Sequence, residues 1–412
     1  MRKPEDAVAA LPPNTAERPG SSVERTVRRA PGWSWRSRST RALVYQAAVV
    51  VLLIVLAALL ARTTLLNLQA RGIRSGFDFL FDPAGFEIGE SVLPFAAGDP
   101  YWRAFAVGLS NTLRVALAGI VLATVIGVLI GIGRLSRNAL LRWICSAYVE
   151  LFRNLPLLQL LMWYFTLTQL LPPVTEALHL GTLVYLSKSG LSFSWPVWAI
   201  GHLTAVLGAV VGVVAGAIVA RRARRAFEAG EGTGPSGTIR LGILLVCTLL
   251  GWLIGGAPLA ADLPEPSVFN ISGGASVTPE FLAVLIGLSV YTAAFIAEIV
   301  RSGIQSVAWG QLEAADALGL PRRLTLRLVV LPQARRVAIA PLANQYLNLI
   351  KNSSLAVAIG YPDLVSISNT TLNQTGRALE CIAIMMSIYL FLSLATAFLM
   401  FRYGLRSAIV ER

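Results

Sequence analysis

The chain of 412 residues is apolar and basic: 55% of its residues are hydrophobic, only 14% are charged, and the formal net charge is +13. Several apolar runs exceed the length of about 18 residues at which a membrane-spanning helix becomes the expected structure. Lysine and arginine gather in short clusters beside these runs, which indicates an all-α, polytopic membrane protein in a lipid bilayer and no nucleic-acid partner.

The first 41 residues are rich in proline, arginine and serine and lack a periodic apolar pattern. Such a segment buries too little apolar surface to fold, so residues 1–41 are expected to be a disordered cytoplasmic tail. The apolar stretch that follows is as long as a spanning helix, which favours an uncleaved first span over a cleaved signal peptide. Residues 42–104 are then expected to hold this span and a periplasmic segment.

Eight apolar stretches are long enough to cross a membrane. They lie near residues 43–61, 105–133, 144–171, 195–220, 239–257, 281–301, 337–359 and 381–402. Arginines such as Arg134, Arg221 and Arg322 mark every second connection, whereas residues 258–280 contain acidic side chains and no lysine or arginine. The positive-inside rule therefore places both termini, including residues 403–412, in the cytoplasm of a multi-pass inner (plasma) membrane protein.

The fourth and fifth stretches, joined by a basic, glycine-rich turn, look like an inserted helix pair over residues 195–257. Glycines recur at helical spacing in both, at Gly208, Gly212, Gly216, Gly251 and Gly255. Small residues at this spacing allow two helices to approach closely in lipid, although glycine is also common in spans without that role. Adding two spans leaves the topology of the surrounding helices unchanged.

No motif in the chain supplies cofactor or covalent chemistry. Cys145, Cys247 and Cys381 lie in or beside apolar runs without metal-ligand spacing. A G-x-x-x-x-G-K-[ST] phosphate loop is missing from the sequence, so any ATP chemistry would belong to another subunit. A nucleophile–base set is also missing, which argues against a membrane enzyme. We expect no cofactor in this chain.

A short cytoplasmic loop at residues 302–334 has the pattern of a docking element. It carries Glu313, Ala314, Ala315, Gly319, Leu331 and Pro332. Two small alanines let the surface of another protein approach a short helix, and Gly319 can end that helix because glycine tolerates a left-handed backbone. Leu331 and Pro332 mark the start of the next element.

The seventh stretch carries one polar stripe. At 100° per residue, an arc of about 120° holds its polar side chains, namely Asn344, Gln345, Asn348, Lys351 and Asn352. A cation at the bilayer centre costs about 2.5 to 3.5 kcal/mol, so such residues normally face a bundle interior or a wet cavity. The pattern predicts that Asn344, Asn348 and Asn352 line a translocation path with Lys351 nearby. A polar seam between helices or subunits, or a snorkelling Lys351, is the alternative.

Several strings in order then point to one family. They are Asn111–Ala116, Tyr148–Pro156 and Asn344–Leu355, together with the loop pattern above. These strings resemble the polar amino-acid branch of ABC-importer permeases. Residues 359–364 and 369–376 and the inserted pair are similar to its general L-amino-acid permease subunits. The resemblance covers most of residues 105–402; Val329 stands where the family usually has isoleucine.

The resemblance implies the type I ABC importer permease fold. Two permease subunits would form the pathway, two ABC ATPase subunits would bind ATP and Mg beneath them, and a periplasmic amino-acid-binding protein would deliver the substrate. The loop residues Glu313, Ala314, Ala315, Gly319, Leu331 and Pro332 would then contact the ATPases. The resemblance favours a heterodimer with a related permease, while a homodimer stays open. Arg322, Arg323 and Arg327 suit either positive-inside anchoring or pairing with the ATPase.

A secondary transporter or channel is the rival class. It would give the alanine-containing loop no function, and it would more naturally place acidic residues in the middle of the spans, where few occur.

Glu298 and the Glu150–Arg153 pair are expected to form internal ion pairs. Which amino acids are carried depends on pocket shape and is not encoded in a motif.

Overall fold

The computed structural model describes residues 38–70, 76–157, 159–229, 237–267 and 271–407. Its residues divide into two compact units, Met1–Ile73 and Arg74–Arg412. The predicted tail lies outside the described residues, except for positions 38–41, which begin the first helix.

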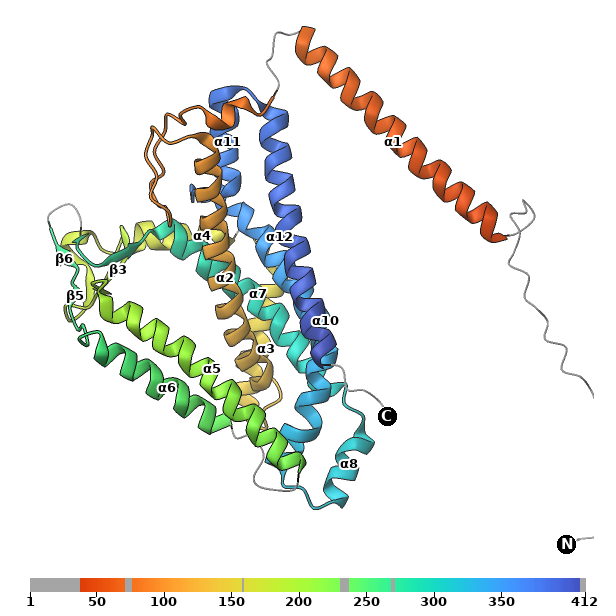
Figure 1. Cartoon of the computed structure of the whole chain (residues 1–412), viewed down its shortest axis with the longest axis vertical. Helices are drawn as coiled ribbons and strands as arrows, with labels where there is room; N and C mark the ends of the chain where they lie inside the picture. Colours follow the sequence, from red (N-terminus) through yellow and green to blue (C-terminus); the bar gives the residue numbers. More distant parts are fainter. Residues whose placement is uncertain (1–37, 71–75, 158, 230–236, 268–270, 408–412) are drawn as a thin grey trace, which may run out of the picture. The chain divides into compact units, whose positions relative to one another are not determined.

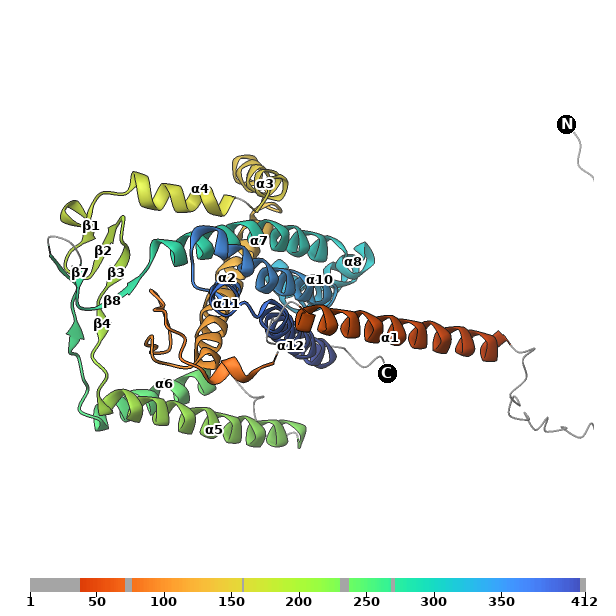
Figure 2. The same ribbon diagram turned by 90° about the horizontal axis from the view of Figure 1, so that it is seen from above.

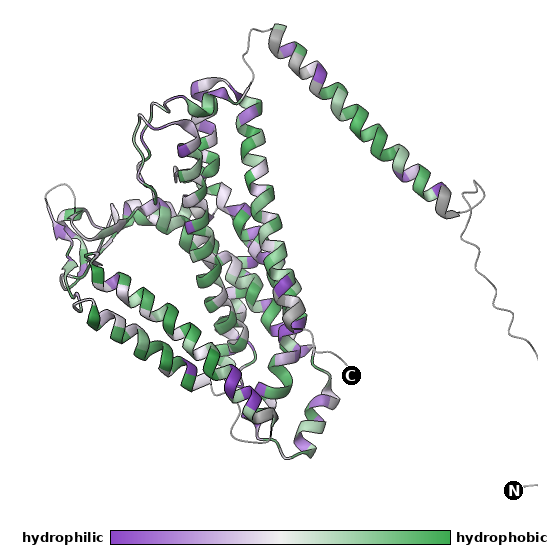
Figure 3. Ribbon diagram, viewed as in Figure 1, coloured by the Kyte–Doolittle hydropathy of each residue, from purple (hydrophilic) through white to green (hydrophobic). Residues whose placement is uncertain are grey.

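The first unit contributes helix α1, Arg38–Ala70. Nearly all the large apolar side chains whose exposure the structure describes are exposed in α1, and Figure 3 shows that the middle of the helix is hydrophobic. The predicted span 43–61 lies within it, and the helix extends further at both ends.

The second unit is built from helices and short connections. Its helices are α2 (Tyr101–Gly133), α3 (Ala139–Asn154), α4 (Gln159–Phe165), α5 (Ile200–Glu228), α6 (Gly237–Ile254), α7 (Pro279–Gln305), α8 (Trp309–Ala317), α9 (Arg322–Leu324), α10 (Leu331–Asn352), α11 (Leu364–Thr375) and α12 (Ala378–Ser407). The helices α2 and α7 pack along each other, and α10 packs against both and against α12 (Figure 1, Figure 2). Val115, Leu288 and Leu349, from these three central helices, are fully buried in the core.

Six described helices are long and apolar enough to cross a membrane: α1, α2, α5, α6, α7 and α12. The other two expected stretches are helical but differ in form. The stretch 144–171 is interrupted after α3, where Leu155 is extended, because the residue before a proline disfavours the helical conformation. It resumes as α4 and a π-helical turn, Thr166–Leu170. The stretch 337–359 is α10 followed by a 3-10 helix, Ser353–Ile359, and α10 is more polar than the six.

Short strands lie where the sequence predicted connections, except β4 (Trp195–Pro196), which occupies the start of the predicted span 195–220. An antiparallel sheet has the order β1 (Leu178–Leu180), β2 (Val184–Ser187), β3 (Gly190–Phe193) and β8 (Ala275–Val277), with β2 and β3 paired Tyr185 to Ser192. Two further pairs are β4 (Trp195–Pro196) with β5 (Ala261–Asp262), and β6 (Glu265–Pro266) with β7 (Ile271–Ser272). Because β4 occupies Trp195 and Pro196, the fourth span starts at Ile200 rather than at 195. The predicted insertion is thus a helical hairpin flanked by strands.

The helices α5 and α6 pack against each other through glycines. A Cβ atom at Gly208 would lie 2.3 Å from the carbonyl oxygen of Cys247, and one at Gly251 would lie 2.3 Å from that of Thr204. No larger residue fits at either position without separating the helices. The predicted close contact of the inserted pair is therefore confirmed.

A buried arginine fastens the segment after α1 to the helical bundle. The guanidinium of Arg377, just before α12, donates to both carboxylate oxygens of Asp78 and to the carbonyl oxygen of Gly76, at 2.9 to 3.1 Å. It also lies over the ring of Phe79, 5.5 Å from the centroid. The Gly76 N–H donates to Glu380 at 2.8 Å, which completes the contact.

Replacing this arginine should destabilise the protein more than removing its carboxylate partner. In Arg377→Gln the Gly76 carbonyl loses its donor and the Phe79 ring loses its cation, which should cost about 1 to 3 kcal/mol. In Asp78→Asn the loss should be smaller, because the Asp78 side chain is 73% exposed. Thermal unfolding of the detergent-purified variants, followed by tryptophan fluorescence, gives the melting temperature of each. Equal losses of melting temperature in Arg377→Gln and Asp78→Asn would contradict the role of Arg377.

Candidate functional site

The predicted docking loop begins with the short helix α8, which carries Glu313, Ala314 and Ala315. The side chains of Glu313 and Ala314 are exposed, whereas Ala315 is 2% exposed and faces the chain itself. The sequence suggested that both alanines would form one outward surface for a partner. In the structure only Ala314 faces outward, because Ala315 is buried. Ala314 offers a small exposed surface, and Ala315 lets α8 pack closely on the turn Thr325–Val330.

The end of α8 is a glycine turn. Gly319 has a φ of +67°. Its N–H donates to the Asp316 carbonyl at 2.9 Å, and the Leu320 N–H donates to the Ala315 carbonyl at 3.1 Å. This pair of bonds is the Schellman motif, which satisfies the last carbonyls of the helix. A Cβ atom at Gly319 would meet nothing within 4 Å, so the demand for glycine is purely conformational.

The loop then enters α10 without a break. A π-helical turn, Thr325–Val330, leads into α10, which starts at Leu331 with Pro332 in its first turn. The side-chain amide of Gln333 donates to Gln311 of α8 at 3.3 Å, so the two ends of the loop are in contact. Leu331 and Pro332 begin the next helix, as predicted.

Arginines surround this loop. Arg322, Arg323 and Arg327 are exposed, and within the described ranges none of them forms an ion pair. Their positive charge is thus available to an acidic partner or to the membrane surface.

An ion-pair cluster joins the α7 and α2 ends that lie next to the loop. Glu298 of α7 pairs with Arg134 at the end of α2 and with Arg301 on its own helix. The expectation that Glu298 forms an internal ion pair is confirmed. The Glu150–Arg153 pair is not formed among the described residues, because Arg153 instead lies over the Phe295 ring at 5.6 Å.

The polar stripe of α10 faces away from the core of this chain. Asn344, Asn348 and Lys351 are exposed, and Gln345 and Asn352 are half-buried. On the other face of the helix, Leu349 and Ile350 are buried in the core. The division of α10 into polar and apolar faces follows the predicted arc.

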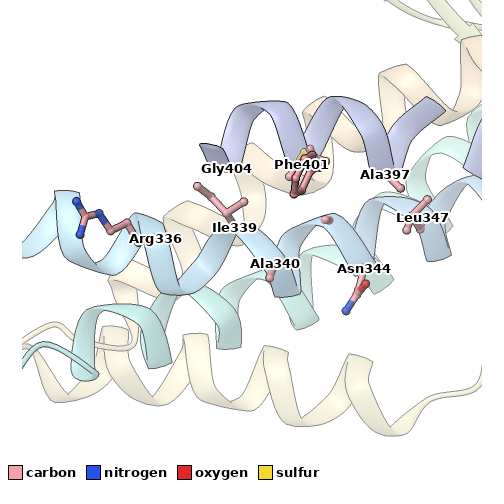
Figure 4. A pocket seen from close by; sticks show the side chains of 10 residues that line it. Arg336, Ile339, Ala340, Asn344, Leu347, Ala397, Phe401 and Gly404 are labelled. Carbon is pink, nitrogen blue, oxygen red and sulfur yellow. The ribbon is translucent and has the colours of Figure 1, made fainter. Parts of the chain in front are cut away.

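Asn344 borders an apolar groove between α10 and α12. The groove has a volume of about 640 Å³, and its lining includes Ile339, Ala340 and Leu347 of α10 and Ala397 and Phe401 of α12 (Figure 4). The structure does not gather Asn344, Asn348, Lys351 and Asn352 around a closed polar cavity in the described part of the chain.

At the end of the bundle opposite α8, a polar network was not foreseen from the sequence (Figure 1). Asp363 is fully buried, and its carboxylate accepts the Ser366 N–H at 2.8 Å, which caps α11. The second carboxylate oxygen faces the Tyr389 hydroxyl of α12, and neither atom makes a hydrogen bond of normal geometry. Burial raises the pKa of Asp363 to about 7. The polar pair Asn111 and Thr112, within the mainly apolar stretch 105–133, was the available signal in the sequence.

These two side chains connect α2 to the segment before α11. The Asn111 amide donates to the Pro362 carbonyl at 2.9 Å, and the Thr112 hydroxyl accepts the Leu364 N–H at 3.1 Å. The Tyr361 hydroxyl donates to the Asn111 carbonyl at 3.3 Å. The chain that follows the polar helix α10 is thus fixed to α2.

Comparisons with known proteins agree on one kind of protein. Residues 238–406 match the family described as "Binding-protein-dependent transport system inner membrane component". The chain is 44% identical to the general L-amino acid transport system permease protein AapQ of Rhizobium johnstonii, over 95% of this chain and 99% of that protein. It is 44% identical to the putative amino-acid ABC transporter permease protein YhdX of Escherichia coli, over 92% and 97% of the two chains. It is 39% identical to the glutamate/glutamine/aspartate/asparagine transport system permease protein BztB of Rhodobacter capsulatus, over 88% and 93%.

The raised pKa of the buried Asp363 carboxyl should make the free energy of unfolding depend on pH. Unfolded aspartate has a pKa of about 3.9, so between about pH 4 and 7 the folded protein keeps a proton that the unfolded chain releases. The free energy of unfolding should fall as the pH rises through this window, by roughly 4 kcal/mol at most, and should level off above it.

Asp363→Asn should flatten this dependence while retaining the cap, because asparagine is also a good N-cap residue. Asp363→Ala should lower stability at every pH by removing the cap. Melting temperatures of purified protein between pH 5 and 8 separate the two variants. An unchanged slope in Asp363→Asn would assign the pH dependence to another group.

Proposed function

Because this chain belongs to the amino-acid permease family of ABC transporters, we propose that it is the membrane-spanning subunit of an ATP-driven importer that receives amino acids from a periplasmic binding protein. The observation that carries this proposal is the exposed loop from α8 to the start of α10, closed by the glycine turn at Gly319. Partner ATPase subunits bind ATP and Mg and grip this loop. Both termini lie in the cytoplasm, on the same side as the loop.

The loop is joined rigidly to the helices that it would move. Its start continues from α7, whose Glu298 is paired with Arg134 of α2, and its end is the first turn of α10. The Gln311–Gln333 contact links both ends. Closure of the ATPases would therefore displace α7, α2 and α10 together, and this rocking alternates access to a central site.

The pathway is completed by a second subunit. The exposed stripe of Asn344, Asn348 and Lys351 is too polar to face lipid without cost, so we place it against a second, related permease subunit. The path lies between two such surfaces, with Asn352 at its half-buried end. Amide side chains both donate and accept hydrogen bonds, which suits the ammonium and carboxylate groups shared by all amino acids.

The glycine turn should be required for coupling. Gly319→Val places a β-branched residue in the left-handed conformation, which costs about 1 to 2 kcal/mol and distorts the ATPase contact. Uptake into proteoliposomes containing the full transporter should fall several-fold, while ATP hydrolysis persists.

Gly319→Asn is the matched control, because asparagine tolerates the left-handed conformation and the position has room for a side chain. This variant should retain most uptake. Normal uptake with Gly319→Val would show that the turn is not part of the coupling contact.

The polar stripe should be required for passage of the substrate. Asn348→Leu and Lys351→Met, made separately, should each reduce amino-acid uptake by about tenfold or more, because each removes a polar group from the path. The conservative variants Asn348→Gln and Lys351→Arg should retain much more uptake. Radiolabelled uptake, normalised to the amount of permease in the membrane, is the measurement; full activity in both apolar variants would place the path elsewhere.

A further inference from the structure

A groove opens between the two inserted helices, near the basic turn that joins them. It has a volume of about 390 Å³ and is lined by Gly212, Val213, Gly216 and Ala217 of α5 and by Arg240, Leu241 and Leu244 of α6. Its lining is apolar apart from Arg240. We call its apolar part, over Gly216 and Leu244, the slot; the guanidinium group of Arg240 is the one cationic group in the lining.

The groove exists because the helices separate toward that turn. A Cβ atom at Gly212 would lie 2.9 Å from the Cα of Leu244, so the helices still touch there. At Gly216 the nearest atom is 3.7 Å away, on Arg240, which is ordinary van der Waals distance. The missing side chain at Gly216 therefore leaves an open space rather than a tight contact.

Positive charge gathers at the same end of the hairpin. Arg221, Arg222, Arg224 and Arg225 are exposed on the last turns of α5, and Arg240 is exposed on the first turns of α6. In the described part of the chain none of the five forms an ion pair. Arg221 follows Gly216 by five residues, or about 7.5 Å along the helix axis. Figure 3 shows the hydrophilic end of α5 directly after its hydrophobic body.

We propose that this groove binds an anionic phospholipid of the cytoplasmic leaflet. One acyl chain lies in the slot over Gly216 and Leu244, and the phosphate is held by Arg240 together with the arginines at the end of α5. The location supports a lipid, because a slot within a hydrophobic hairpin is reached from the bilayer, and a basic pocket between spans on the cytoplasmic side matches an anionic head group. The choice of leaflet rests on the orientation proposed above.

The binding would have a structural consequence for the insertion. The helices α5 and α6 pack mainly against each other, so a lipid wedged between their separated ends would hold the hairpin open at that end. The arginines would meanwhile fix the depth of the hairpin at the membrane surface.

Native mass spectrometry of the full-length permease, titrated with phosphatidylglycerol or with phosphatidylcholine of the same acyl chains, tests the proposal. Wild-type protein should prefer phosphatidylglycerol. Arg240→Gln should weaken binding of the anionic lipid about fivefold and reduce the preference, since one arginine near the head group is lost.

Gly216→Leu should weaken binding of both lipids by filling the slot, and the 3.7 Å clearance allows the hairpin to form. The matched control is Gly242→Leu, on the same helix pair, where an added side chain meets nothing within 4 Å and does not line the groove. This control should bind as the wild type does. Equal binding by wild type, Gly216→Leu and Arg240→Gln would overturn the proposal, as would a wild type that binds neither lipid because another protein's helix fills the groove.

Discussion

The structure depends on one constraint: inside hydrocarbon, every backbone N–H and C=O must find a partner within the protein. Continuous helices satisfy it, and local bonds supply partners to backbone groups at the described ends of the two irregular stretches. Where Pro156 interrupts the third stretch, the Leu155 N–H still donates to Leu151 at 3.1 Å and the Gln159 N–H donates to Pro156 at 3.2 Å. At the end of α10, the Ser353 N–H reaches carbonyl groups of the preceding turn, and the chain continues as a 3-10 helix. The strands, which need partners from elsewhere in the chain, occur in the connections.

The cost of placing polar groups in lipid also supports the proposal that a second subunit covers part of this chain. Side chains in lipid should be apolar, yet α10 exposes Asn344, Asn348 and Lys351 while it buries Leu349 and Ile350. An exposed polar stripe beside an apolar groove is reasonable only when a second protein surface covers it. The exposed stripe therefore supports the proposed assembly, in which the path lies between this chain and a second permease subunit.

Periodicity and turn chemistry could be predicted from the sequence, whereas long-range pairing could not. The faces of α10 followed from 100° per residue, and the turn at Gly319 followed from the tolerance of glycine for positive φ. The alanines show the limit of this reasoning: Ala314 and Ala315 lie 100° apart on the helix, and the burial of Ala315 depends on how α8 packs, which the spacing does not encode. The network of Asn111, Thr112 and Asp363 joins residues about 250 positions apart, and no local pattern encodes such pairing.

Under the proposed coupling, the contacts divide the chain into helices that would move with the loop and helices that would not. The Gln311–Gln333 hydrogen bond joins α8 to α10, and the Glu298–Arg134 pair joins α7 to α2, so a force on α8 reaches three central helices through short, defined contacts. Through the fixed segment at Asp363, α10 is in turn connected to the opposite end of α2. The inserted hairpin has its main contacts within itself, through Gly208 and Gly251, and stands outside this route. On the proposed mechanism, the insertion would leave the coupling geometry unchanged, because it adds two spans and no strong contact between the loop and the polar stripe.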